Sequence, residues 1–336
     1  MYHLKIDHQQ KTPKYLKIVD SIIIDIEKGV LKKNQQLPSL NELSSSSDLS
    51  RDTVEKAYRI LKDRGVVTAV KGKGFYVNGL ENHKIQILLI LNKLSSYKKR
   101  IYYAFLEILQ DKADVDLQIH HYNPYLFEEI IAENLGKYDY YVVVPIFGFQ
   151  ADESQIMNTL EKITNNKLMF LDKEFPRYQQ NCPSVFQDFE WDVFNTLEGC
   201  QTQLIKYKRL VLVFPSDNNC PIEIIRGTRT FCSRYKKDFF VKEHLIDEKL
   251  EPDTIFLVIE DSDLADLIKK VRLSGLRLGE QIGIISFNDT TLKELLDITV
   301  ISTDFEAMGK TAATMILNKQ KDKIKNPFFM IQRGSL

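Results

Sequence analysis

One short stretch combines hydroxyl, guanidinium and carboxylate groups within four positions. Ser50-Arg51-Asp52-Thr53 stands at the start of an amphipathic segment. The N-terminus of a helix carries a positive dipole, and it enters the major groove in helix-turn-helix proteins. Arg51 is the best candidate for contacting a guanine edge or a phosphate. We expect this turn to bind DNA; the alternative is that Ser50 only caps the helix and Arg51 only faces solvent.

A glycine loop with two lysines is the second candidate group. Lys71-Gly72-Lys73-Gly74 lies between residues 66–70 and 75–77, which are rich in β-branched and aromatic residues. The pattern predicts a β-hairpin, or wing, whose glycines permit close approach to phosphates and whose lysines carry positive charge. The loop is not a nucleotide-binding P-loop, because the G-K-[ST] ending and a following helix are missing.

Three helices are predicted before this hairpin. Thr12-Pro13 marks the first helix start, Ser39 and Glu42 have the spacing of a capping box, and Ser50 caps the third helix. The apolar faces consist of Tyr15, Val19, Ile22 and Ile26, then Leu40 and Leu43, then Val54, Ala57, Tyr58 and Leu61. Two short helices joined by a tight turn form a helix-turn-helix.

Composition and charge limit the class of protein. The 336 residues are 43% apolar with a formal net charge of zero, which suits more than one buried core. Residues 1–77 contain 14 Lys or Arg against 9 Asp or Glu, a charge of +5, so the remainder carries −5.

The apolar runs fall short of the roughly 18 residues of a membrane helix, and the N-terminus does not resemble a secretory signal. We expect a cytoplasmic protein, with no membrane partner, whose basic end binds a polyanion.

Neither a metal nor a cofactor is predicted. The cysteines lack a paired C-x-x-C spacing and are expected to be reduced, mostly structural thiols: Cys182, Cys200, Cys220 and Cys232. The alternative is a site built from Cys220, Cys232 and a histidine. His120 and His121 are expected to point to opposite faces of a strand, so that they would not share an ion.

The N-terminal region resembles the GntR family of bacterial regulators. The resemblance runs from P-K-Y-L-K-I through L-P-S-L-N-E-L and L-S-R-D-T-V-E-K-A-Y-R-I-L to K-G-K-G-F-Y-V. Asn41 and Glu55 stand where many members carry arginines, so the operator sequence does not carry over. The helix-turn pattern and this resemblance together predict a DNA-binding set of Ser39, Asn41, Ser50, Arg51, Asp52, Thr53, Lys71, Gly72, Lys73 and Gly74.

From Lys84 the chain alternates continuous Val, Ile and Leu runs with amphipathic stretches. Predicted strands include 85–91, 117–121, 140–144, 168–171, 210–214, 255–258 and 282–286. Helices are predicted over 96–112, 128–134, 156–164, 191–207, 223–234 and 264–273. The alternation predicts a doubly wound α/β fold with parallel strands covered on both faces. The predicted domains are a winged helix-turn-helix at 1–77, a linker at 78–83, and an effector and dimerisation domain at 84–336.

Ligands of such sheets bind beyond the carboxyl ends of the strands. The residues at these places are Ser95 to Lys98, Phe147, Phe149, Asp172, Ser216, Asp217, Glu260, Asp261, Asn288 and Asp289. Carboxylates, amides and rings suit a polyhydroxylated ligand, whose hydroxyls need donors and acceptors and whose C–H faces stack on rings. For a single Asp or Asn, the alternative role is helix capping.

The large domain resembles the effector domain of the LacI family. The matching stretches are F-L-D-K, I-I-R-G-T-R-T-F-C, I-G-I-I-S-F-N-D-T, T-V-I-S-T-D-F-E-A-M-G-K and I-Q-R-G-S. The resemblance implies two lobes, with chain crossings near Asp188, Ser302 and Asn326. It implies ligand contacts from Tyr97, Lys98, Asp172, Arg226, Glu260 and Asn288. Glu260 replaces the family's usual asparagine and Asn288 its usual aspartate, which alters hydroxyl recognition. His244 either reaches the pocket rim or lies on the surface.

A GntR-type head on a LacI-type body resembles the arabinose-repressor subgroup. The implied function is a homodimeric regulator, most simply a repressor of carbohydrate-utilisation genes, that binds double-stranded operator DNA and a sugar, sugar alcohol or sugar phosphate. The alternatives are a non-sugar effector, an enzyme fused to a DNA-binding head, and a sugar-transport binding protein. The roughly 255 residues after the wing are short for an aminotransferase-like body and contain no nucleophile elbow, so we do not expect an enzyme.

Overall fold

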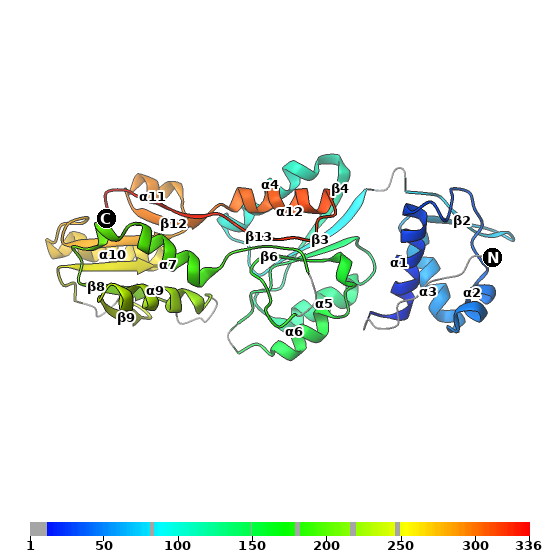
Figure 1. The fold of residues 1–336 in the computed structure, drawn as a ribbon, viewed down its shortest axis with the longest axis horizontal. Helices are drawn as coiled ribbons and strands as arrows, with labels where there is room; N and C mark the ends of the chain where they lie inside the picture. The colour runs from blue at the N-terminus through cyan, green and yellow to red at the C-terminus, as the bar shows by residue number, and fades with distance from the viewer. Residues whose placement is uncertain (1–11, 81–83, 149, 179–181, 216–219, 246–248) are drawn as a thin grey trace.

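A computed structural model describes residues 12–80, 84–148, 150–178, 182–215, 220–245 and 249–336. The chain forms a small N-terminal head and an elongated body with two larger sheets (Figure 1). The head lies beside the first of these sheets, and the second lies at the far end of the molecule. No helix in the described ranges is long and apolar enough to cross a membrane. Residues 1–11 and, within the predicted linker, residues 81–83 lie outside the described ranges.

Residues 12–80 form three helices and a hairpin around one core. The elements are α1 (Lys14–Glu27), α2 (Leu40–Ser47), α3 (Arg51–Asp63), β1 (Val67–Val70) and β2 (Gly74–Val77). The predicted inner face of α3 is buried against Val19 and Ile22 of α1 and Leu43 of α2. β1 and β2 pair antiparallel. The predicted helix-turn-helix and wing are confirmed.

Local hydrogen bonds explain where these helices begin. Ser39 Oγ accepts from the Glu42 N–H at 3.3 Å, and Glu42 Oε2 accepts from the Ser39 N–H at 2.8 Å, which completes the predicted capping box. Ser50 Oγ accepts from the Thr53 N–H at 3.3 Å. The Tyr58 hydroxyl of α3 donates to the Pro38 carbonyl at 2.9 Å. These contacts hold α2 and α3 in one orientation.

The first sheet of the body has the strand order β13-β7-β6-β5-β3-β4, with parallel pairs throughout. Its strands are β3 (Ile85–Leu91), β4 (Ala113–Ile119), β5 (Tyr140–Val143), β6 (Leu168–Asp172), β7 (Ser184–Phe186) and β13 (Lys323–Lys325). One face packs on α4 (Ser96–Leu109) and α12 (Phe305–Leu317), the other on α5 (Pro124–Asn134) and α6 (Glu153–Leu160). Short 3-10 turns lie at Gln110–Lys112 and Asn165–Lys167. This layered unit is called the first lobe.

The second lobe has the strand order β14-β12-β11-β10-β8-β9. Its strands are β8 (Arg209–Val213), β9 (Asp238–Lys242), β10 (Thr254–Val258), β11 (Ile282–Phe287), β12 (Thr299–Thr303) and β14 (Phe328–Ile331). Only β12 and β14 pair antiparallel among them. Helices α7 (Phe189–Gly199), α8 (Gln201–Leu204) and α9 (Glu223–Arg234) cover one face of this sheet, and α10 (Asp261–Ser274) covers the other. The short helix α11 (Thr291–Leu295) lies between β11 and β12 in the chain.

The described chain passes between the lobes at three places, near the positions that the LacI resemblance implies. The crossings lie between β7 and α7 at Asp188, between β12 and α12 at Asp304, and between β13 and β14 at Asn326. The buried Asn326 side chain donates to Thr303 Oγ1 at 2.7 Å and to the Asp304 carbonyl at 2.8 Å. Two of the crossings are therefore bonded to each other.

The predicted fold class is confirmed, and several element bounds differ. β4 ends at Ile119, so His120 and His121 lie beyond the strand and the prediction that they occupy its opposite faces is wrong. Among the strands that were not predicted, β7 and β12 lie inside the sheets, and β9, β13 and β14 lie at their edges. The edge strands β9, β13 and β14 are partly exposed, and such strands need no continuous apolar run.

Candidate DNA-binding surface and ligand cleft

The first turn of α3 presents two of the predicted side chains to solvent. Arg51 and Asp52 are exposed, and Arg51 Nη1 lies 3.6 Å from Glu55 Oε2 one turn further along. Ser50 Oγ lies 2.7 Å from Thr53 Oγ1 and also caps the helix. Because an exposed ion pair contributes little free energy, Arg51 can exchange Glu55 for a phosphate or a base edge.

The start of α2 and the wing tip complete the exposed polar surface. Ser39 uses its hydroxyl in the capping box, whereas the Asn41 side chain faces solvent. Lys71, Gly72 and Lys73 are exposed. Two lysines on a hairpin tip suit contact with a phosphate backbone.

A glutamine before α2 holds the wing in place. Gln36 Nε2 donates to the Lys73 carbonyl at 2.6 Å. Gly74 has φ +103, which favours glycine, and a Cβ there would lie 3.3 Å from the same amide and crowd it. No sequence pattern marks Gln36, because its partner lies 37 residues further along the chain.

In the first lobe, two predicted ligand contacts are bonded to each other. Lys98 Nζ lies 2.5 Å from Asp172 Oδ2, and both side chains are buried. The second oxygen of Asp172 accepts from Gln187 Nε2 at 2.5 Å. Asp172 also has φ +71. The carboxylate is thus fixed at the end of β6, with its charge balanced by Lys98.

Tyr97 brings the first lobe close to the second. Its ring stacks on Phe305 with centroids 5.3 Å apart. Burial, followed by the carboxylates of Asp261 and Glu260, raises the pKa of the Tyr97 hydroxyl. Glu260 is the N-cap residue of α10, but its side chain makes no capping bond. Tyr97 therefore lies on the side of the first lobe that faces Asp261 and Glu260 of the second lobe, and we call the region between these residues the interlobe cleft.

The loop after β11 is fixed by a buried lysine. Lys293 Nζ donates to the carbonyls of Phe287 at 2.6 Å and Asn288 at 3.1 Å, and it lies 2.8 Å from Asp261 Oδ1. Burial lowers the pKa of Lys293. Asn288 has φ +63 and donates its N–H to the Ile301 carbonyl at 2.7 Å. This backbone arrangement holds Asn288 at the carboxyl end of β11.

The other residues that were predicted at the ligand site do not cluster with Lys98 and Asp172. Arg226 is exposed on α9, and His244 is exposed beyond β9. Phe149, Ser216 and Asp217 lie outside the described residues. The structure does not bring Arg226 or His244 into bonded contact with Lys98 and Asp172 in the described part of the chain.

Two buried polar side chains at the cleft were not predicted. Asn92 follows β3 and His120 follows β4, and these strands are neighbours. Asn92 Oδ1 and His120 Nδ1 have no hydrogen-bond partner among the described residues. His120 Nε2 lies 3.1 Å from the Val144 carbonyl, so Nε2 carries the proton and Nδ1 is an acceptor. Burial lowers the pKa of His120 to about 4. Two buried acceptors without a partner among the described residues thus lie beyond the carboxyl ends of neighbouring strands.

Charged groups also meet across the cleft. Lys173 Nζ of the first lobe lies 2.9 Å from Glu223 Oε1 of α9. Burial opposes the Lys93 cation, yet Tyr122 and Glu260 outweigh it and raise the pKa of Lys93. The Lys173–Glu223 pair and the influence of Glu260 on Lys93 join the two lobes, so both depend on how far apart the lobes lie.

The thiols fit a structural role. Cys182, Cys200 and Cys232 are buried, and the described residues form no metal-binding group of three or more His, Cys, Asp or Glu. Burial raises the pKa of Cys200 to about 11 and those of Cys182 and Cys232 to about 12. Such thiols are poor nucleophiles near neutral pH.

Two family profiles match the chain. Residues 14–77 match the profile of bacterial regulatory proteins, gntR family, and residues 218–329 match a periplasmic binding protein-like domain. The transcriptional repressor YtrA of Bacillus subtilis is 31% identical over 98 residues, which cover 29% of this chain and 72% of YtrA. The chain belongs to the GntR family of bacterial regulatory proteins.

This GntR-family regulator also aligns with a repressor along most of its length. The arabinose metabolism transcriptional repressor of Geobacillus stearothermophilus is 23% identical over 346 residues, covering 92% of each chain. The trehalose repressor from Escherichia coli superposes with a TM-score of 0.60 at 15% identity, covering 74% of this chain and 100% of that chain. The superposition confirms the periplasmic-binding-protein-like fold. The relatives are transcriptional regulators, in agreement with the prediction that the chain is not an enzyme.

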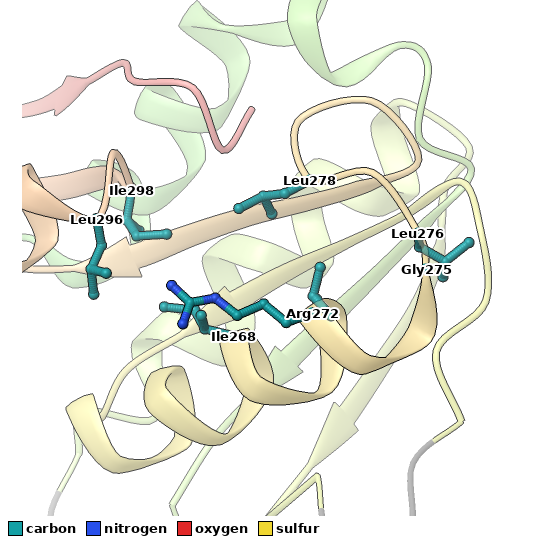
Figure 2. A pocket seen from close by; sticks show the side chains of 8 residues that line it. Ile268, Arg272, Gly275, Leu276, Leu278, Leu296 and Ile298 are labelled. Atoms are coloured by element: carbon teal, nitrogen blue, oxygen red, sulfur yellow. The ribbon is translucent and has the colours of Figure 1, made fainter.

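The second lobe of the regulator has a hollow beside α10 and several exposed leucines in α10 and α11. A hollow of about 270 Å³ lies beside α10 (Figure 2), lined by Ile268, Val271, Arg272, Gly275, Leu276, Leu278, Leu296 and Ile298. Near it in the chain, Leu273, Leu292 and Leu295 are 88%, 70% and 76% exposed. We call these three residues, with Leu296, the leucine surface. Leu296 also lines the hollow, and exposed large apolar side chains are a feature of protein–protein interfaces.

Proposed function

We propose that the chain is a DNA-binding repressor of carbohydrate-utilisation genes, controlled by a sugar or sugar derivative bound between the two lobes. The observation that carries this proposal is the full-length alignment with an arabinose metabolism repressor, which covers 92% of each chain. The geometry is consistent with it, since Arg51 and the wing tip are exposed on the head and polar side chains such as Lys173 and Glu223 meet between the lobes.

The proposed domains are the head at 1–77, the linker at 78–83 and the effector domain at 84–336, in a cytoplasmic homodimer. Two heads match two operator half-sites, and the leucine surface offers a place for a second copy of the chain to pack. Arg51, Lys71 and Lys73 contact phosphates or base edges in this proposal. The other DNA contacts are Ser39, Asn41, Ser50, Asp52, Thr53, Gly72 and Gly74.

The effector proposal rests on the chemistry of the cleft. Asn92 and His120 offer acceptors, Glu260 offers a carboxylate and Tyr97 offers an aromatic face. Hydroxyl-rich ligands need such a combination. Lys98, Asp172, Arg226 and Asn288 complete the proposed set. A non-sugar effector is the alternative, and it would be favoured if only ligands without several hydroxyls stabilised the protein.

DNA binding is tested by titrating a fluorescent duplex with the full chain at several salt concentrations. Lys73→Ala is expected to weaken binding and to reduce the slope of log K against log salt by about 0.9 for each lost phosphate contact. Lys208→Ala is the matched control, because Lys208 is an exposed lysine on the second lobe. Equal affinities and slopes for both variants and the wild type would contradict the assignment of the wing.

The effector is tested by a thermal-shift screen over pentoses, hexoses, deoxysugars and their phosphates. A bound ligand raises the melting temperature by mass action. The ligand found in this way is expected to lose its effect in a His120→Gln variant, which keeps a donor for Val144 but removes the Nδ1 acceptor. If no member of the panel raises the melting temperature, the sugar proposal fails.

A further inference from the structure

The head has a second buried face, separate from its own core. Leu16 and Asp20 of α1 are buried, but they lie outside the cluster that joins α1, α2 and α3. A Cβ placed on Gly136 of the first lobe would overlap Leu16 Cδ2 and lie 3.4 Å from Ile60 Cδ1. The head therefore packs directly against the first lobe, at a glycine that has room for it.

Ion pairs of opposite polarity join the head to the first lobe at this contact. Lys167 Nζ of the first lobe lies 2.6 Å from Asp20 Oδ1, and Thr164 Oγ1 donates to Asp20 Oδ2 at 2.8 Å. Arg64 at the end of α3 pairs with Asp139, whose Oδ2 also accepts from the Gln86 N–H at 2.9 Å. The side chains of Asp20, Lys167 and Arg64 are only 10%, 13% and 5% exposed. The head also supplies Glu27, whose Oε1 lies 2.9 Å from Lys319 Nζ in a more exposed pair. The two buried pairs thus consist of one anion and one cation of the head, each with a partner in the lobe.

The position of these pairs separates them from both proposed binding surfaces. Asp139 precedes β5 and Lys167 precedes β6, whereas Asp172 and the cleft lie at the opposite ends of the strands. Arg64 follows the last residue of α3, whereas Arg51 is its first residue, and a helix of this length spans about 20 Å. Docking therefore leaves the DNA-binding side of the head open.

We propose that these residues form a releasable latch that fixes the orientation of the head on the first lobe. Buried ion pairs add little net stability but are sensitive to geometry, because removing one partner leaves an uncompensated charge. Two pairs of opposite polarity also admit one docking orientation and oppose others. Since Lys167 directly precedes β6, a movement of that strand on ligand binding would disturb the latch. This regulatory role rests on the proposed function, whereas the docking does not.

The latch is tested by hydrogen exchange on the full chain, with no DNA or effector present. Asp20→Lys and Lys167→Glu each place like charges together and are expected to raise amide exchange at least tenfold in residues 16–20 and 163–168. The double variant Asp20→Lys/Lys167→Glu restores opposite charges and is expected to return exchange toward the wild-type rate. Lys162→Glu is the matched control, because Lys162 pairs with Glu128 inside the first lobe.

Wild-type exchange in both single variants, or a double variant that exchanges as fast as the single variants, would overturn the latch. Unchanged exchange in β10 and β11 of every variant shows that the second lobe remains folded. A glycine pair gives an independent readout: Gly136→Ala should raise exchange in residues 16–20, whereas Gly29→Ala, with a similar φ but open space, should not.

Failure of the latch and failure of the proposed function give different results. The latch variants are expected to bind a random-sequence duplex within about twofold of the wild type, because their substitutions lie away from the wing. Loss of duplex binding in the wild type would contradict the proposed function while leaving the exchange result intact. Normal duplex binding together with unchanged exchange in the single variants would reject the latch alone.

Discussion

Lys167 and Asp172 lie at the two ends of strand β6. Lys167 pairs with Asp20 of the head, and Asp172 pairs with Lys98 in the cleft. β6 has five residues, which span about 17 Å at the usual rise. A single buried strand thus connects a contact that orients the head with a contact that faces the proposed ligand site. This strand is the shortest covalent route between the two.

Removing one of the two charges of the buried Lys98–Asp172 pair is expected to lower the free energy of unfolding. Asp172→Asn leaves the buried Lys98 cation without a counter-charge, and the free energy of unfolding should fall by about 3–5 kcal/mol. Glu280→Gln, which removes one partner of an exposed pair with Arg277, should change it by less than about 1 kcal/mol. Urea unfolding measures both variants, and equal losses would contradict the role of burial.

The cap of α3 is expected to contribute to both stability and DNA binding. Ser50→Ala removes the acceptor for the Thr53 N–H and should destabilise the head by about 1 kcal/mol. It should also weaken duplex binding, since the first turn of α3 loses its fixed geometry. Ser45→Ala, an exposed position within α2, is the comparison. A Ser50→Ala head as stable as the Ser45→Ala head would show that the cap is not needed.

Acid stability should depend on His120. Its pKa falls from the ordinary 6.5 to about 4 on burial, so the unfolded state binds more protons between these values. Stability is therefore complete above about pH 6.5 and is lost as the pH falls toward 4, by about 3 kcal/mol in total. His120→Gln should remove this part of the acid loss, as measured by urea unfolding at pH 7 and pH 5. An unchanged pH 7 to pH 5 difference would contradict the buried neutral imidazole.

The leucine surface should hold two copies of the chain together. Leu292→Lys/Leu295→Lys introduces like charges at exposed positions and is expected to convert a dimer into a monomer in sedimentation equilibrium. Ile205→Lys changes another highly exposed apolar residue, at the end of α8, and should leave the dimer intact. A dimer that survives the leucine substitutions would place the interface elsewhere.

The head was more predictable from sequence than the cleft, for a physical reason. The caps at Ser39 and Ser50 and the inner face of α3 arise from neighbours in the sequence, so their spacing is visible there. The burial of Leu16 and Asp20 was not predicted, since the residues that cover them lie more than 100 positions away. Likewise, Lys98 and Asp172 were both selected, but nothing local indicated that they bond to each other.

At the ends of the strands, too, some features could be predicted from the sequence and others could not. A continuous apolar run predicted β3, and its carboxyl end gave the general position of the cleft. Asn92 and His120 were missed because their importance comes from burial beyond two strands that are neighbours in the sheet. Edge strands such as β9 were missed because exposure removes the apolar pattern on which strand prediction depends.

In the proposed function, a sugar bound between the lobes changes the affinity of the head for DNA. The most direct test is the affinity of the full chain for an operator selected from random duplexes, measured with and without a saturating amount of the sugar that most raises its melting temperature. We predict a change in Kd of about 5- to 150-fold, the usual range for coupled sites. An unchanged Kd while the sugar demonstrably occupies the protein would contradict the account.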